Sequence, residues 1–391
     1  MGDLGTVVLT HLKRSSLAWL LVLLGLFSRP VASNPLLTPS PPAIQAGAHI
    51  LMDYHSGRVL AENNADERME PASLTKLMTS YAAFFELGKG NIRLDDAVRV
   101  SEKAWRTSGS RMFVEVDKAV PLEQLLKGVI IQSGNDASVA LAEFVAGDEA
   151  AFSQIMNHHA QRLGMSNTNF VNATGLPDPD EYTTARDMAV LARAIIQDFP
   201  EHYGWHAVRQ YEYNGITQYN RNKLLWRDDS VDGLKTGYTS SAGYCLVASA
   251  KRDGMRLISV VLGSQSENTR AQESQTLLNF GFRFFETHRL YQGQEPLTQV
   301  RIWEGAASQV EAGLGEDLYL TVPRGQFDQL KGDLQLEAVL KAPIEKGQPL
   351  GTASISLADE PIAERPLIAL HAVAEGGLWQ RLTDRLRLYF Q

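Results

Sequence analysis

The stretch Pro71-Ala72-Ser73-Leu74-Thr75-Lys76 opens a helical pattern, because the apolar residues after it recur at three- and four-residue steps as far as Phe85. Proline is favoured in the first turn of a helix, so Ser73 is predicted to lie near a helix N-terminus. A spacing of three residues puts Ser73 and Lys76 on the same helical face. If burial or nearby cations lower its pKa, Lys76 can accept the hydroxyl proton, which makes Ser73 a candidate nucleophile.

Two further motifs follow, and each supplies a part that a serine nucleophile needs. Ser133-Gly134-Asn135 is turn-like and stands between helices predicted over 122–131 and 137–145, while Lys235-Thr236-Gly237 marks a strand edge. Taken alone, the first two motifs are common by chance and the third is rarer. Each could mark only an ordinary structural feature: a helix start, a helix-ending turn, or a strand edge with a solvated lysine. The informative observation is that all three occur in this order, separated by 60 and 102 residues.

The segments around these motifs mix helical and strand patterns. A hairpin, two strands and a further helix are predicted, at 48–62, 243–250, 255–262 and 269–285. This mixture predicts an α/β or α+β first domain. From about residue 295 the pattern changes to short alternating strands, predicted at 300–303, 318–322 and 334–340, which indicate a small all-β module.

The last segment, 378–391, has the pattern of an amphipathic helix. One face carries the apolar residues Leu378, Trp379, Leu382, Leu386, Tyr389 and Phe390, and the segment also holds three arginines and one aspartate. Such a helix is expected to lie in a membrane interface, with aromatic rings at headgroup depth and cations toward anionic lipid. The alternative is a helix that docks on its own protein. The preceding Glu375-Gly376-Gly377, which resembles a flexible hinge, favours the membrane.

Residues 1–33 have the pattern of a secretory signal peptide. Lys13 and Arg14 precede an apolar run over 17–27, and small residues precede the expected cleavage after Ser33. The alternative is a retained membrane anchor, but the run is well short of the roughly 20 apolar residues that a membrane span needs. We therefore expect an exported protein.

Composition excludes several classes of function. The apolar and charged fractions, 44% and 21%, are ordinary for a globular protein, and the net charge of −8 offers no basic footprint for nucleic acid. The single cysteine, Cys245, excludes an internal disulfide framework and a cysteine-based zinc cluster. None of the nine histidines falls in a motif, so a Ser-His-Asp triad has little support. We expect neither a metal nor a cofactor.

Together the three motifs resemble those of the penicillin-binding and serine β-lactamase superfamily. Within it, the segments at 71–76, 220–222 and 231–238 are similar to the low-molecular-mass D-alanyl-D-alanine carboxypeptidases, and the likeness extends through 242–244 and 281–286 into the β module and terminal helix. The resemblance implies a penicillin-binding transpeptidase-like fold in four parts. These are a signal peptide at 1–33, a catalytic domain at 34–290, a β-rich domain at 295–373 and an amphipathic anchoring helix at 375–391.

The resemblance also implies a role for each matching residue. Ser73 attacks the carbonyl between two terminal D-alanines, Lys76 accepts its proton, and Ser133 relays a proton to the leaving amine. The backbone amides of Ser73 and Tyr238 form the oxyanion hole. The residues implied to bind substrate are Asn135, Lys235, Thr236, Gly237, Tyr238 and Arg270, with the cations and Thr236 near the terminal carboxylate.

The implied activity is removal of the terminal D-alanine from peptidoglycan pentapeptides through an acyl-enzyme, with acylation by β-lactam antibiotics. The implied location is the periplasmic face of the bacterial inner membrane. Alternatives on the same fold are an endopeptidase that cuts D-alanyl cross-links and a weak β-lactamase. A further alternative is a non-catalytic penicillin-binding scaffold.

Overall fold

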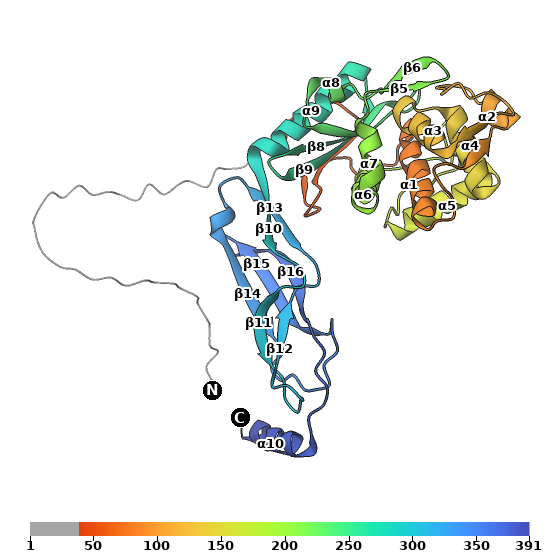
Figure 1. The fold of residues 1–391 in the computed structure, drawn as a ribbon. Coiled ribbons are helices and arrows are strands. Elements are labelled where there is room, and N and C mark those ends of the chain that lie inside the picture. The colour runs from red at the N-terminus through yellow and green to blue at the C-terminus, as the bar shows by residue number, and fades with distance from the viewer. Residues whose placement is uncertain (1–38, 391) are drawn as a thin grey trace, which may run out of the picture. The chain divides into compact units, whose positions relative to one another are not determined.

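The structure is a computed structural model that describes residues 39–390, and the predicted signal peptide at 1–33 lies outside the described residues. The first domain is organised on a five-stranded antiparallel sheet in the order β2-β1-β9-β8-β7. The strands are Val59–Asn63 (β2), Ala48–Asp53 (β1), Met255–Ser264 (β9), Gly243–Arg252 (β8) and Val231–Thr239 (β7). The predicted hairpin and both predicted strands are confirmed, with β8 and β9 side by side (Figure 1). Strand β7 forms one edge of the sheet.

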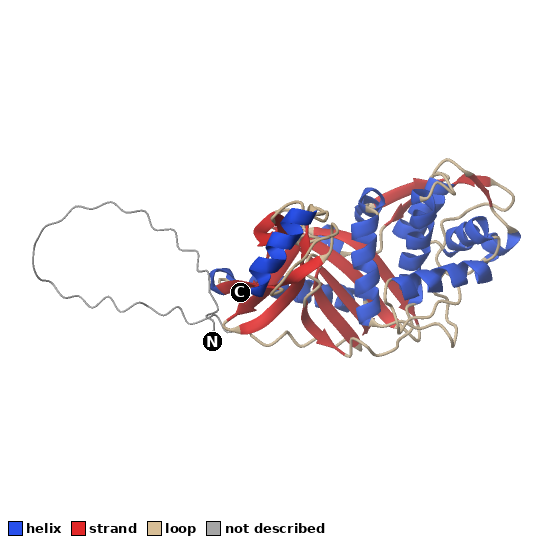
Figure 2. Ribbon diagram, turned by 90° about the horizontal axis from the view of Figure 1, so that it is seen from below, coloured by secondary structure: helices blue, strands red, loops and turns tan. Residues whose placement is uncertain are grey.

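Helices cover both faces of this sheet (Figure 2). Successive side chains of a strand point to opposite faces, so a strand can contribute apolar residues to both of the cores that these helices form. In β8, Cys245 belongs to the core shared with α1 (Thr75–Gly88) and α6 (Ala185–Asp198). Its neighbour Leu246 packs in the core formed with α9 (Glu267–Phe284), which confirms the helix predicted at 269–285. The sheet is thus the middle one of three layers.

A second apolar core lies beside α1 and holds the segment that carries the Ser133 motif. It is built mainly by α1, α2 (Glu102–Arg106), α3 (Leu122–Lys127) and α4 (Asn135–Ala146). The helix predicted over 122–131 is confirmed, but after α3 it continues as a π-helical turn over Gly128–Gln132. This turn ends at Ser133, whose φ of 66° is left-handed, so the chain reverses there before α4 begins.

Shorter elements complete the first domain. The helices are α5 (Glu149–Arg162), α7 (Pro200–Tyr203) and α8 (Leu224–Arg227), and the strand pairs are β3 (Ala97–Arg99) with β4 (Ala119–Pro121) and β5 (Gln210–Tyr213) with β6 (Ile216–Tyr219).

The chain after α9 forms the expected β module. Strand β10 (Phe285–Tyr291) pairs with β13 (Leu318–Pro323), and a five-stranded sheet follows the order β11-β12-β16-β15-β14. Its strands are Pro296–Arg301 (β11), Gln309–Gly313 (β12), Glu360–Ala369 (β16), Pro349–Leu357 (β15) and Leu330–Leu336 (β14). The strands predicted at 300–303 and 334–340 are each displaced, because apolar Trp303 and Leu340 lie outside the strands and pack on the core from loops.

The terminal helix α10 (Leu378–Tyr389) is present, and the apolar residues of its predicted face are exposed. Its polar face contacts the β module. Asp384 is 8% exposed and accepts a hydrogen bond of 2.9 Å from the backbone amide of Glu304, whose carboxylate pairs with Arg385 at 3.0 Å and with Arg381 at 3.8 Å. The expectation that the arginines point to lipid is therefore corrected for Arg381 and Arg385, which contact Glu304 in the β module. Among residues 39–390, no helix has the length and apolarity required to cross a bilayer.

Candidate active site

Ser73 lies where a 3₁₀ turn, Ala72–Leu74, leads into α1, and two segments are packed against this junction. One contains Gly175, which has a φ of +74° and approaches so closely that an added Cβ would lie 1.7 Å from the carbonyl oxygen of Ala72. The other is β7, where a Cβ on Gly237 would lie 3.0 Å from the Pro71 carbonyl. The predicted helix start is confirmed, and Ser73 is bordered by a loop and by the KTG strand.

Lys76 has an acceptor for each of its three ammonium hydrogens. Its Nζ donates to the Ser73 hydroxyl at 3.1 Å, to Oδ1 of Asn135 at 2.7 Å and to the carbonyl of Thr174 at 2.6 Å. The side chain is 1% exposed, and burial lowers its pKa to about 7, although the Glu181 carboxylate acts in the opposite direction. A large fraction of Lys76 is therefore neutral near pH 7, as a general base for Ser73 requires.

The second and third motifs meet through their side chains. Nζ of Lys235 donates a hydrogen bond of 2.8 Å to the Ser133 hydroxyl and another of 2.9 Å to the carbonyl of Thr236. Asn135 is held between Lys76 and the carbonyl of Ser108, to which its Nδ2 donates at 2.6 Å. The three motifs, separated in sequence, thus form one hydrogen-bonded group around Ser73.

Lys235 is 3% exposed and lies behind the surface of the cleft, as Lys76 does. Burial is the main cause that holds its pKa well below the usual range, and the charges of Lys76, Arg221 and Arg270 add to this effect. Two buried lysines in one network repel each other when both are charged. The charge of Lys76 therefore favours the neutral form of Lys235.

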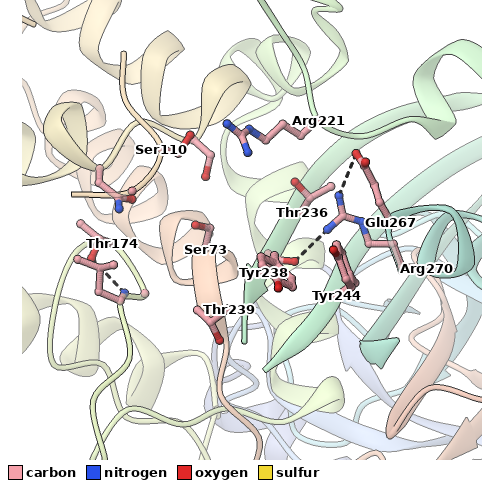
Figure 3. A pocket seen from close by; sticks show the side chains of 16 residues that line it. Ser73, Ser110, Thr174, Arg221, Thr236, Tyr238, Thr239, Tyr244, Glu267 and Arg270 are labelled. Carbon is pink, nitrogen blue, oxygen red and sulfur yellow. Dashed lines mark hydrogen bonds and ion pairs between the residues drawn. The ribbon is translucent and has the colours of Figure 1, made fainter. Parts of the chain in front are cut away.

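A cleft of about 350 Å³ opens in front of these groups, and Figure 3 shows the side chains that line it. Ser73, Ser133, Asn135, Thr236, Gly237, Tyr238 and Arg270, all predicted from the sequence, are among its lining residues. Arg270 belongs to α9, and two contacts orient its guanidinium group. Nη1 donates a hydrogen bond of 3.0 Å to the carbonyl of Gly237, and the group forms a 3.6 Å ion pair with Glu267. Tyr238 stands beside Tyr244, with ring centroids 4.3 Å apart.

Other lining residues were not predicted as parts of the site. They are Gly109, Ser110, Thr174, Gly175, Leu176, Arg221, Thr239, Tyr244 and Glu267. Arg221 had a signal, since it is the centre of the Asn220-Arg221-Asn222 segment. Ser110 and Thr174 come from irregular loops, which carry no periodic pattern that could connect them to Ser73.

Cys245 does not line the cleft. The thiol is buried in β8, and burial raises its pKa to about 11, so it remains protonated and unreactive. Within residues 39–390, no group of three or more histidine, cysteine, aspartate or glutamate side chains is arranged to hold a metal ion.

A serine at a helix start, hydrogen-bonded to a buried lysine and facing a cleft lined by cations, is the arrangement expected of a serine hydrolase. The comparisons with known proteins agree with that class. Residues 36–266 match the family model of the D-alanyl-D-alanine carboxypeptidases, and residues 285–375 match that of the penicillin-binding protein 5 C-terminal domain. The chain therefore belongs to the D-alanyl-D-alanine carboxypeptidase family, and it is a hydrolase of that kind.

Individual relatives cover between 62% and 92% of the chain. The D-alanyl-D-alanine carboxypeptidase DacC of Escherichia coli is 46% identical over 92% of this chain and 92% of its own length. Penicillin-binding protein 5 from Haemophilus influenzae is 41% identical with a TM-score of 0.84, over 86% of this chain and 100% of that one. Penicillin-binding protein D2 from Listeria monocytogenes, in an ampicillin-bound form, is 29% identical with a TM-score of 0.58, over 62% of this chain and 100% of that one. These likenesses confirm the predicted fold class.

Proposed function

We propose that Ser73 is the nucleophile and Lys76 the general base of the carboxypeptidase reaction, with a peptidoglycan stem ending in D-Ala-D-Ala as the substrate. The observation that carries this assignment is the 3.1 Å contact between Nζ of Lys76 and Oγ of Ser73, made by a lysine that burial holds partly neutral. An ammonium group could only donate to the serine. A neutral amine at this distance can take the serine proton as the oxygen attacks.

Acylation then proceeds with protons that the site can supply. Ser73 Oγ bonds to the carbonyl carbon of the last peptide bond while its proton passes to Lys76. The C–N bond breaks as the leaving nitrogen receives a proton from the Ser133 hydroxyl. The proton that Lys76 took from Ser73 returns to Ser133 through the hydrogen-bonded group, so Lys76 is neutral again, while Lys235 holds the Ser133 hydroxyl in place at 2.8 Å. D-Alanine leaves, and an ester on Ser73 remains. Hydrolysis of that ester follows when neutral Lys76 takes a proton from water as the water oxygen bonds to the ester carbonyl carbon. The proton passes to Ser73 Oγ as the ester C–O bond breaks, which restores free Ser73.

Two backbone amides are proposed to stabilise the negative oxygen of the tetrahedral intermediate. The amide of Ser73 belongs to the first turn before α1, and that of Tyr238 belongs to β7, an edge strand that packs on Pro71 and Ala72. Preorganised donors of this kind typically contribute about 3 kcal/mol each to transition-state stabilisation.

Positive charge and a hydroxyl gather at the end of the cleft proposed for the substrate carboxylate. Thr236, Arg270 and Arg221 all line the cleft. In an acidic protein this local concentration of cations selects for an anionic terminus. A carboxypeptidase needs such selection, since its substrate is the peptide end with a free carboxylate.

The same serine is proposed to be acylated by β-lactams. The lactam ring presents an amide carbonyl to Ser73 Oγ, and because its leaving nitrogen stays tethered, the adduct persists. The ampicillin-bound form of the Listeria relative supports this extension.

The proposed location is the outer surface of a bacterial inner membrane, reached by export and held by α10. The helix exposes Trp379, Tyr389 and Phe390, each more than 80% accessible, on the side away from its contacts with Glu304. Burial of an exposed leucine or aromatic residue in lipid is favourable by about 2 kcal/mol.

The test is flotation with anionic vesicles. The mature chain should float, a Leu382→Gln/Leu386→Gln variant should float at least about tenfold less, and equal flotation would exclude this anchor.

The catalytic assignment is tested with the mature chain, a synthetic pentapeptide and penicillin. We expect release of D-alanine and a penicillin adduct on the peptide that contains Ser73, both abolished in Ser73→Ala. Retained D-alanine release in that variant would refute the nucleophile. Muropeptide dimers and a chromogenic β-lactam, assayed in parallel, distinguish endopeptidase and β-lactamase turnover from the proposed reaction.

A further inference from the structure

Glu181 is a buried carboxylate near the site that the mechanism above does not use. It is 3% exposed and lies just before α6 in the chain. One carboxylate oxygen accepts a hydrogen bond of 2.5 Å from the Thr75 hydroxyl, and the other accepts one of 2.7 Å from Nδ2 of Asn172. A third, longer bond of 3.4 Å comes from the backbone amide of Val171. Glu181 therefore connects the first turn of α1 to the loop that follows residue 170.

Asn172 passes this connection to the catalytic lysine. Its Oδ1 accepts from the backbone amides of Thr174 and Gly175, at 2.9 and 2.7 Å, and from the Thr174 hydroxyl at 2.7 Å. These bonds fix a tight turn. The carbonyl of Thr174 in that turn is the acceptor 2.6 Å from Nζ of Lys76.

We propose that Glu181 is a positioning residue for the reaction at Ser73, which fixes Lys76 from two sides. Through Thr75 it holds the backbone next to Lys76 on α1, and through Asn172 it holds the turn whose Thr174 carbonyl accepts from Nζ. This proposal rests on the proposed role of Lys76 as the base. No contact of Glu181 with substrate is required.

The charge of Glu181 has a second effect on the same lysine. Its carboxylate favours the ammonium form of Lys76, as the Asp136 carboxylate does, while burial and Arg221 favour the neutral amine. Burial raises the pKa of Glu181 to about 7, close to that of Lys76. Removal of the carboxylate charge therefore lowers the pKa of Lys76, so the fraction of neutral lysine at low pH increases.

The variant Glu181→Gln separates these effects from simple loss of structure. The amide keeps the size of the side chain but cannot accept from both Thr75 and Asn172, because one of its two oxygens is replaced by a donor. We expect the maximal rate of penicillin acylation to fall by about tenfold. The acidic limb of its pH profile should move to lower pH by about half a unit.

Glu149→Gln is the matched control. Glu149 accepts from the backbone amide of Ala173 at 3.1 Å, in the same loop, and pairs with Lys103 at 2.8 Å. It is not among the charges that act on Lys76. Its substitution should leave the acidic limb in place.

Thr75→Val provides a second test that keeps the Glu181 side chain. It removes only the donor at 2.5 Å, so Glu181 becomes harder to ionise and the acidic limb should move in the same direction. Circular dichroism and thermal melting verify that each variant is folded. The proposal would be overturned if the acidic limb of the acylation pH profile stays in place in the folded variants, whether or not their maximal acylation rate is lower. If wild-type chain forms the Ser73 adduct but releases no D-alanine, the carboxypeptidase assignment fails while the acylation profiles still decide the role of Glu181.

Discussion

Nζ of Lys235 donates a 2.8 Å hydrogen bond to the hydroxyl of Ser133, and this contact connects two motifs that lie 102 residues apart. It leaves the hydroxyl proton of Ser133 free to be donated toward the cleft. A serine held in this way by a buried lysine is suited to proton relay rather than to packing, because Ser133 also lines the cleft. The consequences can be tested residue by residue.

Ser133→Ala removes the relay and leaves Lys235 without its partner. We expect kcat for D-alanine release to fall by about 100-fold, since loss of general acid catalysis has that size. Ser110→Ala is the control, because Ser110 lines the same cleft but donates its hydroxyl to the carbonyl of Gln132 at 2.9 Å. Steady-state release assays measure both, and comparable losses in the two variants would contradict the relay.

Acylation is expected to depend on pH through Lys76. Because the folded enzyme holds the pKa of Lys76 at about 7, below the ordinary value, the reactive neutral form increases as pH rises through that value. The penicillin acylation rate should be about tenfold slower at pH 6 than at pH 8. Stopped-flow or quenched labelling between pH 5 and 9 measures this. A flat profile across that range would show that deprotonation of Lys76 does not limit acylation.

Arg270→Gln should weaken recognition of a free carboxylate. In the wild type, a peptide amidated at its C-terminus should be a much poorer substrate than the free acid. In the variant, the ratio of kcat/KM for the free acid to that for the amide should fall by about tenfold, because one charged hydrogen bond is worth about 1.5–3 kcal/mol. Arg283→Gln on the exposed side of the same helix is the control. An unchanged preference in Arg270→Gln would place the carboxylate elsewhere.

Gly175→Ala should destabilise the site because its added Cβ would meet the Ala72 carbonyl at 1.7 Å. Gly147→Ala is a matched control, since its φ of +88° is equally left-handed but no atom lies within 4 Å of the added Cβ. The control should lose about 1 kcal/mol of unfolding free energy and Gly175→Ala several kcal/mol. Urea unfolding measures both. Equal losses would mean that the close approach of the loop to Ala72 is easily relieved.

Local patterns predicted much of this molecule, and distant contacts were the part they missed. Ser73 and Lys76 were predictable because a helix brings residues three apart onto one face. Glu181 was not, because its partners Thr75 and Asn172 lie in different segments and only folding brings them together. The strand expected at 334–340 was displaced for a related reason, since apolar Leu340 is buried by a loop contact with Trp303.

The amphipathic pattern of α10 could not predict which face of the helix contacts the β module, because the pattern is the same in either orientation. Asp384 accepts from the Glu304 amide at 2.9 Å, and this contact directs the apolar face outward. Asp384→Ala should release the helix, because an amide deprived of its acceptor costs about 1–3 kcal/mol when it stays buried. Limited proteolysis at the Gly376-Gly377 connection should then become faster, while vesicle flotation of the mature chain is retained because the apolar residues are intact. Asp333→Ala, on exposed β14, serves as the control. Unchanged proteolysis in Asp384→Ala would show that the contact with Glu304 does not hold the helix.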